Sequence, residues 1–175
     1  IGNTLAKLSM TMGVFVVEGG DNWKVSLTTG KKEFLDTFVK TCEKSVELAK
    51  RVNATWMTVV PGYFERTLPV EIQTANVIEA MKRGASILEP HGLVMVMEPL
   101  SDNPDLFLRT AAQSFMICKS VASPACKTLY DIYHMQIMEG DVIATIKASH
   151  QYFAHYHTGG VPGRNEIDNS QELYY

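Results

Sequence analysis

The sequence predicts an α/β protein in which helices cover a parallel β-sheet. Short apolar, β-prone runs alternate with longer amphipathic helical patterns along the whole chain. Five strands are predicted with helices between them, and no run of consecutive hairpins interrupts this order. Strands joined through helices lie parallel, and a parallel sheet must be covered by helices on its exposed sides. A doubly wound sheet and a closed barrel both fit this pattern, and periodicity alone does not choose between them.

The first third of the chain is expected to contain two strands separated by a long helix. The apolar run 8–17 predicts the first strand, and 55–60 predicts the second. Between them, apolar side chains at i, i+3, i+4 and i+7 spacing predict a helix from about Lys31 to Val52. The side chains on this face are Leu35, Phe38, Val39, Cys42, Val46 and Ala49.

The rest of the chain continues the same alternation. The expected elements are a helix at 69–88, a strand at 93–98, a helix at 104–121, a strand at 128–132, a helix at 141–150 and a strand at 152–157. Side chains alternate between the two faces of a strand. This alternation places Val94 and Val96 on the inward face with Glu98, and it places Phe153 and His155 on the inward face with His157.

Composition limits the classes of function. A chain of 175 residues with 46% hydrophobic content is expected to form a single domain, residues 1–175. A formal net charge of −3 gives no reason to expect a nucleic-acid partner. No run approaches the roughly 18 apolar residues that cross a bilayer, so no membrane partner is expected.

The cysteines and the chain ends suggest where the protein works. The three cysteines show no CxxC spacing, which favours a reduced, cytoplasmic location. The chain opens on Ile1 without a targeting signal and closes on Tyr175 where another element is expected. We therefore expect this sequence to be a piece of a longer protein.

Polar residues interrupt three successive apolar strands near their ends. Glu98 ends one strand, Asp131 lies near the end of the next, and His157 ends the third. Active sites of parallel α/β proteins lie at this carboxyl edge. A buried carboxylate is costly unless it is paired or coordinated. Two carboxylates and one imidazole suit Mn²⁺ or Mg²⁺ best, with Co²⁺ and Zn²⁺ as further options.

A glycine-rich turn follows His157 almost directly. The segment 159–164 reads GGVPGR, and Arg164 offers a planar fork that suits a carboxylate. The glycines let the backbone pass close to a ligand. The alternative is an ordinary strand-to-helix turn with a solvent-facing arginine.

Three segments resemble the hydroxypyruvate isomerase family. Residues 130–141 (YDIYHMQIMEGD) are very similar to its strand-six segment, 161–166 (VPGRNE) to the turn after strand seven, and 97–100 (MEPL) to a strand-five motif. The resemblance runs from about Leu8 to Tyr175. The wider group is the xylose-isomerase-like barrel superfamily, which also contains ketose 3-epimerases and abasic-site endonucleases.

The resemblance implies a (β/α)8 TIM barrel of which this chain supplies about strands three to seven, an incomplete barrel. It also implies a divalent metal held by Glu98, Asp131 and His157, with His134 and Arg164 at the substrate. A strand-eight glutamate, absent from this sequence, would complete the metal site and supply one of two acid/base groups. Glu98 is our candidate for the other. His157 departs from some hydroxypyruvate isomerases, which carry Gln there, whereas the epimerases carry His.

These features predict an isomerase that moves a proton between adjacent carbons of hydroxypyruvate or a related sugar acid through an enediolate. Its partner would be a small sugar or sugar acid, and the protein would be a candidate homo-oligomer. One alternative is a ketose 3-epimerase on a neutral sugar. Another is a truncated, inactive sugar-binding barrel. A DNA-repair phosphodiesterase would need more metal ligands and a basic surface, and net charge −3 argues against it.

Overall fold

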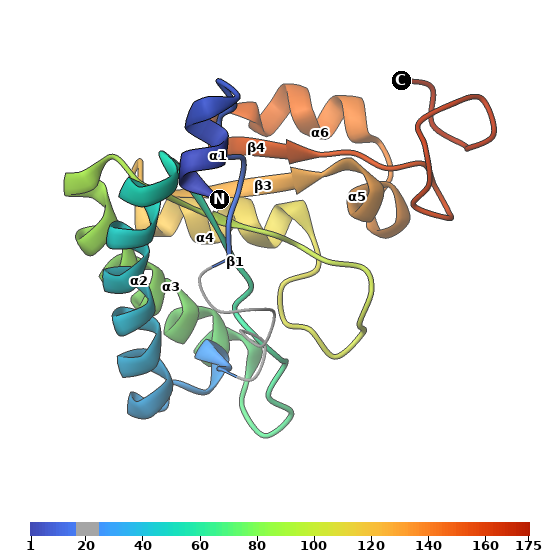
Figure 1. Cartoon of the computed structure of the whole chain (residues 1–175). Helices are drawn as coiled ribbons and strands as arrows, with labels where there is room; N and C mark the ends of the chain where they lie inside the picture. The colour runs from blue at the N-terminus through green and yellow to red at the C-terminus, as the bar shows by residue number, and fades with distance from the viewer. Residues whose placement is uncertain (17–24) are drawn as a thin grey trace.

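The centre of the computed structural model, which describes residues 1–16 and 25–175, is a parallel sheet of four strands. The strands lie in the order β1-β2-β3-β4, which is also their order along the chain. Figure 1 shows β3 and β4 side by side. Their bounds are Trp56–Val59 (β1), Val94–Met97 (β2), Cys126–Asp131 (β3) and Phe153–His157 (β4). Neighbouring strands are parallel throughout, so all four carboxyl ends meet at one edge.

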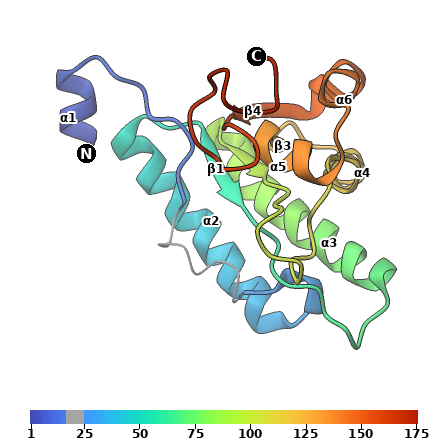
Figure 2. The same ribbon diagram turned by 90° about the vertical axis from the view of Figure 1, so that its right-hand side faces the viewer.

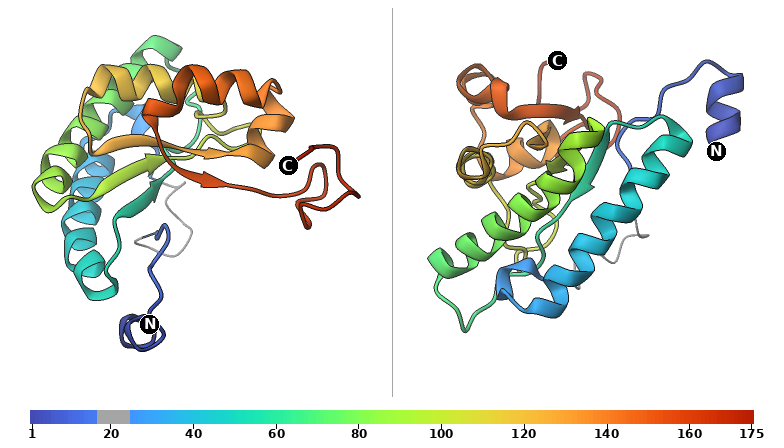
Figure 3. Two further views of the ribbon diagram at one scale, coloured as in Figure 1. Left: turned by 90° about the horizontal axis from the view of Figure 1, so that it is seen from above. Right: turned by 90° about the vertical axis from the view of Figure 1, so that its left-hand side faces the viewer.

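The long helices lie together on one side of the curved sheet (Figures 2 and 3). They are α2 (Lys32–Val52), α3 (Val70–Leu88), α4 (Ala111–Val121) and α6 (Val142–Ser149). The short helix α5 (Ile132–Met138) follows β3 directly, and α1 (Gly2–Lys7) has no buried residue. Single 3-10 turns occupy Leu27–Thr29, Glu89–His91 and His150–Tyr152. Among the described residues, no helix is both long and apolar enough to cross a membrane.

The main core lies between the sheet and these helices, and it fixes which strand face points inward. Met95 packs against the helices, because a Cβ added at Gly84 of α3 would lie 2.7 Å from its Sδ. Met57 and Met97 join Met95 in the same buried cluster. Their strand neighbours therefore face the concave side, where Val96 lies with Glu98 as predicted. Methionine suits such helix–sheet gaps because its flexible side chain fills irregular space.

The predicted α/β class and parallel sheet are confirmed, with differences in three elements. The first expected strand, 8–17, is not formed in its described part, and Val17 lies outside the described residues. Phe15 alone makes a parallel bridge to Met57, beside β1. The helix expected at 104–121 begins only at Ala111, where Thr110 and Gln113 form a capping box. The sequence analysis also missed α5, which Asp131 begins by accepting hydrogen bonds from the backbone N–H groups of Tyr133 and His134.

One predicted strand face is wrong at Phe153. The register between β3 and β4 shifts after Thr128, so Thr128 pairs with Phe153 but Leu129 pairs with His155. This bulge moves Phe153 to the helix side, where its ring stacks on Tyr130 at 4.6 Å between centroids. His155 stays on the concave face and contacts Trp56 of β1, at 5.4 Å between ring centroids. A bulge reverses the alternation that a strict period of two predicts.

Candidate functional site

The ends of β2, β3 and β4 bring Glu98, Asp131 and His157 together. Nδ1 of His157 lies 3.1 Å from Oε1 of Glu98 and 3.8 Å from Oδ2 of Asp131. Asp131 and His157 are register partners in neighbouring strands. The Asp131 side chain has no exposed surface, while that of His157 is about one-third exposed, at 32%. All three predicted metal ligands therefore share one edge of the sheet, on its concave face.

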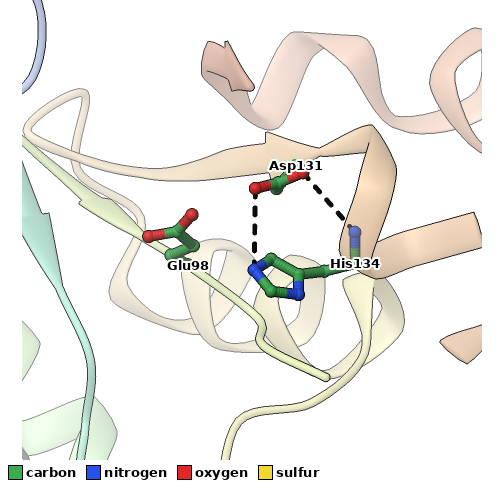
Figure 4. A group of neighbouring side chains, drawn as sticks. All are labelled: Glu98, Asp131 and His134. Carbon is green, nitrogen blue, oxygen red and sulfur yellow. Dashed lines mark hydrogen bonds and ion pairs between the residues drawn. The ribbon is translucent and has the colours of Figure 1, made fainter. Parts of the chain in front are cut away.

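Asp131 connects this group to α5. Its Oδ1 accepts hydrogen bonds from the backbone N–H groups of Tyr133 at 2.9 Å and of His134 at 3.4 Å. This N-cap holds the carboxylate in one orientation, so that Oδ2 is directed toward the site. It also starts α5 at the strand end and thereby places His134 beside Asp131 (Figure 4). The cap at the start of α5 thus places two candidate functional side chains, Asp131 and His134, next to each other.

His134 is buried, with 1% of its side chain exposed, and both ring nitrogens have polar neighbours. Nε2 lies 2.6 Å from Nη1 of Arg164 and 3.6 Å from Oδ2 of Asp131. Nδ1 lies 2.8 Å from the hydroxyl of Ser101, whose backbone N–H also points at it from 3.2 Å. Burial lowers the pKa of His134, although the charges of Asp131 and Asp102 oppose that shift. The direction of this shift favours the neutral imidazole over the charged form.

Arg164 reaches into the same group from the loop after β4. Its Nη2 donates to Oδ2 of Asp131 at 2.7 Å, and its guanidinium lies over the Tyr133 ring at 4.8 Å from the centroid. Its backbone has a positive φ of 54°, an uncommon conformation for a residue other than glycine. The arginine is not the solvent-facing residue of the alternative interpretation, although 41% of its side chain remains exposed.

The two histidines of β4 differ in charge preference. The hydrogen bond with Glu98 raises the pKa of His157, because the carboxylate stabilises the imidazolium. Burial lowers the pKa of His155, and the neighbouring charge of His157 adds to that effect. The ring of His155 contacts Trp56 on the concave side of the sheet.

The donor set suits a hard divalent cation. Ligand atoms of Glu98, Asp131 and His134 all lie within 4.8 Å of one another, and they form the one such group found among the described residues. Carboxylate oxygens and imidazole nitrogens are the ligands that Mn²⁺, Mg²⁺ and Zn²⁺ accept. His157 lies 3.1 Å from Glu98 and 3.8 Å from Asp131, and His134 lies 3.6 Å from Asp131, so two imidazoles lie beside these carboxylates.

Sequence reasoning missed Ser101 and Asp102. Both lie in the loop after Glu98, three and four residues beyond it, and both face Nδ1 of His134. Their place directly after a strand-end carboxylate was the available signal, because such loops line the carboxyl edge of a parallel sheet.

The sequence comparisons with known proteins agree on one family. The family model described as xylose isomerase-like TIM barrel matches residues 1–172. A putative hydroxypyruvate isomerase from Xenopus laevis is 32% identical over 119 residues, 66% of this chain and 43% of that protein. A 2-oxo-tetronate isomerase from Cupriavidus necator is 33% identical over 102 residues, 57% of this chain and 39% of that protein. The chain thus spans less than half the length of these curated relatives.

Among solved structures, a protein from Brucella melitensis described as AP endonuclease, family 2, superimposes with a TM-score of 0.88 at 25% sequence identity. The match covers 99% of this chain and 68% of that one.

Proposed function

Because this chain belongs to the xylose isomerase-like TIM-barrel family, we propose that it is the site-bearing part of a metal-dependent isomerase for hydroxypyruvate or a related small sugar acid. The family match also confirms the predicted TIM-barrel class. One observation carries the proposal: a guanidinium, two carboxylates and two imidazoles meet at one edge of the sheet. The relatives named as isomerases of hydroxypyruvate and 2-oxo-tetronate support an acidic substrate.

Glu98, Asp131 and His157 would hold the divalent ion, with His134 within reach of the same position. Mn²⁺ or Mg²⁺ fits this oxygen-rich set best. When bound, such an ion supplies positive charge that stabilises negative charge developing on substrate oxygens.

The residues of the chain account for the other parts of the reaction. An aldose–ketose type isomerisation removes a proton from one carbon and returns it to the next through an enediolate, so it needs a positioned acid/base group. Glu98 is mostly buried and faces the concave side of the sheet, where it could accept and return that proton. Arg164 would bind the substrate carboxylate through paired N–H donors, and the neutral His134 would bind a substrate oxygen.

A ketose 3-epimerase is the second candidate, and His157 is the observation that favours it. The epimerases of this superfamily carry histidine at this position, and a neutral ketose needs no arginine clamp. An inactive sugar-binding barrel is the non-enzymatic alternative.

Substrate comparison separates these candidates. The full-length protein, with the strand-eight glutamate that the resemblance implies, is assayed with Mn²⁺ on hydroxypyruvate and on neutral ketohexoses. We expect turnover of the acid, and we expect Arg164→Ala to lower kcat/KM at least about 30-fold, equivalent to ~2 kcal/mol for a lost charge-paired contact. Arg83→Ala, which removes an exposed α3 arginine paired with Glu79, is the matched control and should have no effect.

Turnover of ketohexoses with no loss in Arg164→Ala would favour the epimerase. Failure on both substrates by a protein that still binds Mn²⁺ would favour the inactive barrel.

A further inference from the structure

We propose that Ser101 is a positioning residue that sets which ring nitrogen of His134 carries the proton. This inference extends the proposed isomerase site to a residue in the loop after β2. It rests on the proposed function for its catalytic consequence, whereas its structural part concerns only the hydrogen bonds around one buried imidazole.

Two donors point at the opposite nitrogens of His134. The guanidinium of Arg164 can only donate, and its Nη1 lies 2.6 Å from Nε2. The backbone N–H of Ser101 can also only donate, and it points at Nδ1 from 3.2 Å. A neutral imidazole has one donor nitrogen and one acceptor nitrogen, so it cannot accept both hydrogen bonds. Only one of these two donors can therefore form a hydrogen bond to the neutral ring.

The charged and shorter contact with Arg164 determines the outcome. A charge-assisted hydrogen bond is roughly twice as strong as a neutral one, so Nε2 is the acceptor and Nδ1 carries the proton. This Nδ1–H needs an acceptor because the ring is buried. The Ser101 hydroxyl lies 2.8 Å from Nδ1 and can accept. Asp102 is the competing acceptor, but its Oδ1 lies 3.7 Å away on a half-exposed side chain.

The loop holds Ser101 in place through the residue before it. Leu100 is buried in a small apolar cluster with Val60 and Leu106, and its backbone N–H donates to the carbonyl oxygen of Leu108 at 3.3 Å. Ser101 is thus anchored to the same segment that carries Glu98. This packing holds the backbone at Ser101, and the contact with His134 orients the hydroxyl.

The consequence is a defined lone pair at the site. With the proton on Nδ1, Nε2 presents a lone pair to the guanidinium of Arg164 and to a donor of any ligand bound beside it. If the hydroxyl is removed, the remaining backbone N–H of Ser101 favours an acceptor at Nδ1. The proton then moves to Nε2, where Oδ2 of Asp131 lies 3.6 Å away and Arg164 meets a donor instead of an acceptor.

The test is the ¹⁵N spectrum of the histidine rings in the purified protein, which distinguishes protonated from unprotonated nitrogens. The His134 signals are assigned by their loss in His134→Gln. We expect Nδ1–H in the wild type, a shift of the population to Nε2–H in Ser101→Ala, and the wild-type pattern in Ser101→Thr, which keeps a hydroxyl. Asp102→Asn is the matched control and should leave the pattern unchanged.

Wild-type protein with the proton on Nε2, or Ser101→Ala with the wild-type pattern, would overturn the proposal. A shift in Asp102→Asn but not in Ser101→Ala would assign the role to Asp102 instead. If Ser101→Ala does not fold, Ser101→Gly, which also lacks the hydroxyl, replaces it, and a wild-type spectrum with the proton on Nε2 still overturns the proposal.

The same variants link the tautomer to the reaction. With hydroxypyruvate as substrate, we expect Ser101→Ala to lower kcat about tenfold, as for loss of one orienting hydrogen bond, and Ser101→Thr to restore it. A tautomer shift without any isomerase activity in the wild type would reject the proposed function while leaving the role of Ser101 in place. Full activity in Ser101→Ala despite the shift would reject its role in the reaction.

Discussion

Nη2 of Arg164 lies 2.7 Å from Oδ2 of Asp131, the carboxylate whose side chain is completely buried at the end of β3. The arginine therefore neutralises the charge that a divalent cation would otherwise neutralise. A buried carboxylate needs such a partner, because an unpaired charge in the protein interior is strongly destabilising. The same arginine is the group proposed to bind the substrate carboxylate, so its position links the metal and the substrate.

We first predict that Arg164→Ala binds Mn²⁺ more tightly than the wild type when no substrate is present. Removing the guanidinium frees Oδ2 of Asp131, and the gain should be on the order of several-fold, since the arginine is partly exposed and its pairing is screened by solvent. Calorimetric titration with Mn²⁺ measures this. Arg164→Lys, which keeps the charge, should lie between the two. Weaker Mn²⁺ binding by the alanine variant would mean that Arg164 supports the metal site rather than competing for it.

Asp131→Asn should abolish Mn²⁺ binding at Mn²⁺ concentrations from micromolar to millimolar. The amide keeps the shape of the side chain but removes the negative charge that pairs with a cation at the centre of the ligand group. Asp36→Asn is the matched control, because Asp36 lies on the exposed face of α2, where it pairs with Lys32. Equal Mn²⁺ affinity in the two variants would place the metal elsewhere in the protein.

The raised pKa of His157 predicts a pH dependence with a definite sign. Because the folded protein holds this proton more tightly than the unfolded chain, the contribution to stability is complete below the ordinary histidine pKa of about 6.5. It is lost as pH rises through the higher pKa of the folded state. Glu98→Gln removes the hydrogen-bonding carboxylate and should bring the pKa of His157 down, as NMR titration of its ring protons would show.

Chemical unfolding of wild type and Glu98→Gln at several pH values tests the stability effect. The stability advantage from this pair should shrink as pH rises through the His157 titration. An advantage that grows over the same range would contradict the assigned pairing. In the wild type, Mn²⁺ affinity should rise over this range, because a histidine must lose its proton to bind a metal.

Met95→Ala should destabilise the fold by about 2–5 kcal/mol, the usual cost of truncating a large buried side chain. Met95 has no exposed surface and fills the space between β2, Gly84 and Phe38. Met116→Ala on α4 is the matched control, because this methionine is 40% exposed, and its effect should stay within about 0.5 kcal/mol. Urea unfolding measures both, and similar losses for the two would show that Met95 is not part of the structural core.

The sequence alone determined that Glu98, Asp131 and His157 meet. Each residue ends an apolar strand, successive strands are joined by helices, and parallel strands place their carboxyl ends at one edge. The inward face of β2 followed from the same simple rule, since Val96 and Glu98 are two residues apart and Met95 and Met97 pack on the helices. These conclusions depend on local periodicity, which a sequence contains in full.

Where the periodicity changes, the prediction failed. The bulge in the β3–β4 register turned Phe153 to the helix side, and the cap at Asp131 began a helix where a strand was expected to continue. Both depend on which hydrogen bonds the neighbouring strand or helix can satisfy. The apolar run 8–17 illustrates the same limit, because in its described part only Phe15 pairs with β1.

Only the tertiary structure decided how His134 is surrounded. Its neighbours come from three different loops and strand ends, namely Ser101, Asp131 and Arg164. They lie up to 63 residues apart in the sequence. Ser101 and Arg164 lie on opposite sides of the ring. A sequence shows that these residues are polar, but their distances are set by the packing of Leu100, by the cap at Asp131 and by the path of the loop after β4. The choice of donor and acceptor at each ring nitrogen depends on those distances, because hydrogen bonds are short-ranged and directional.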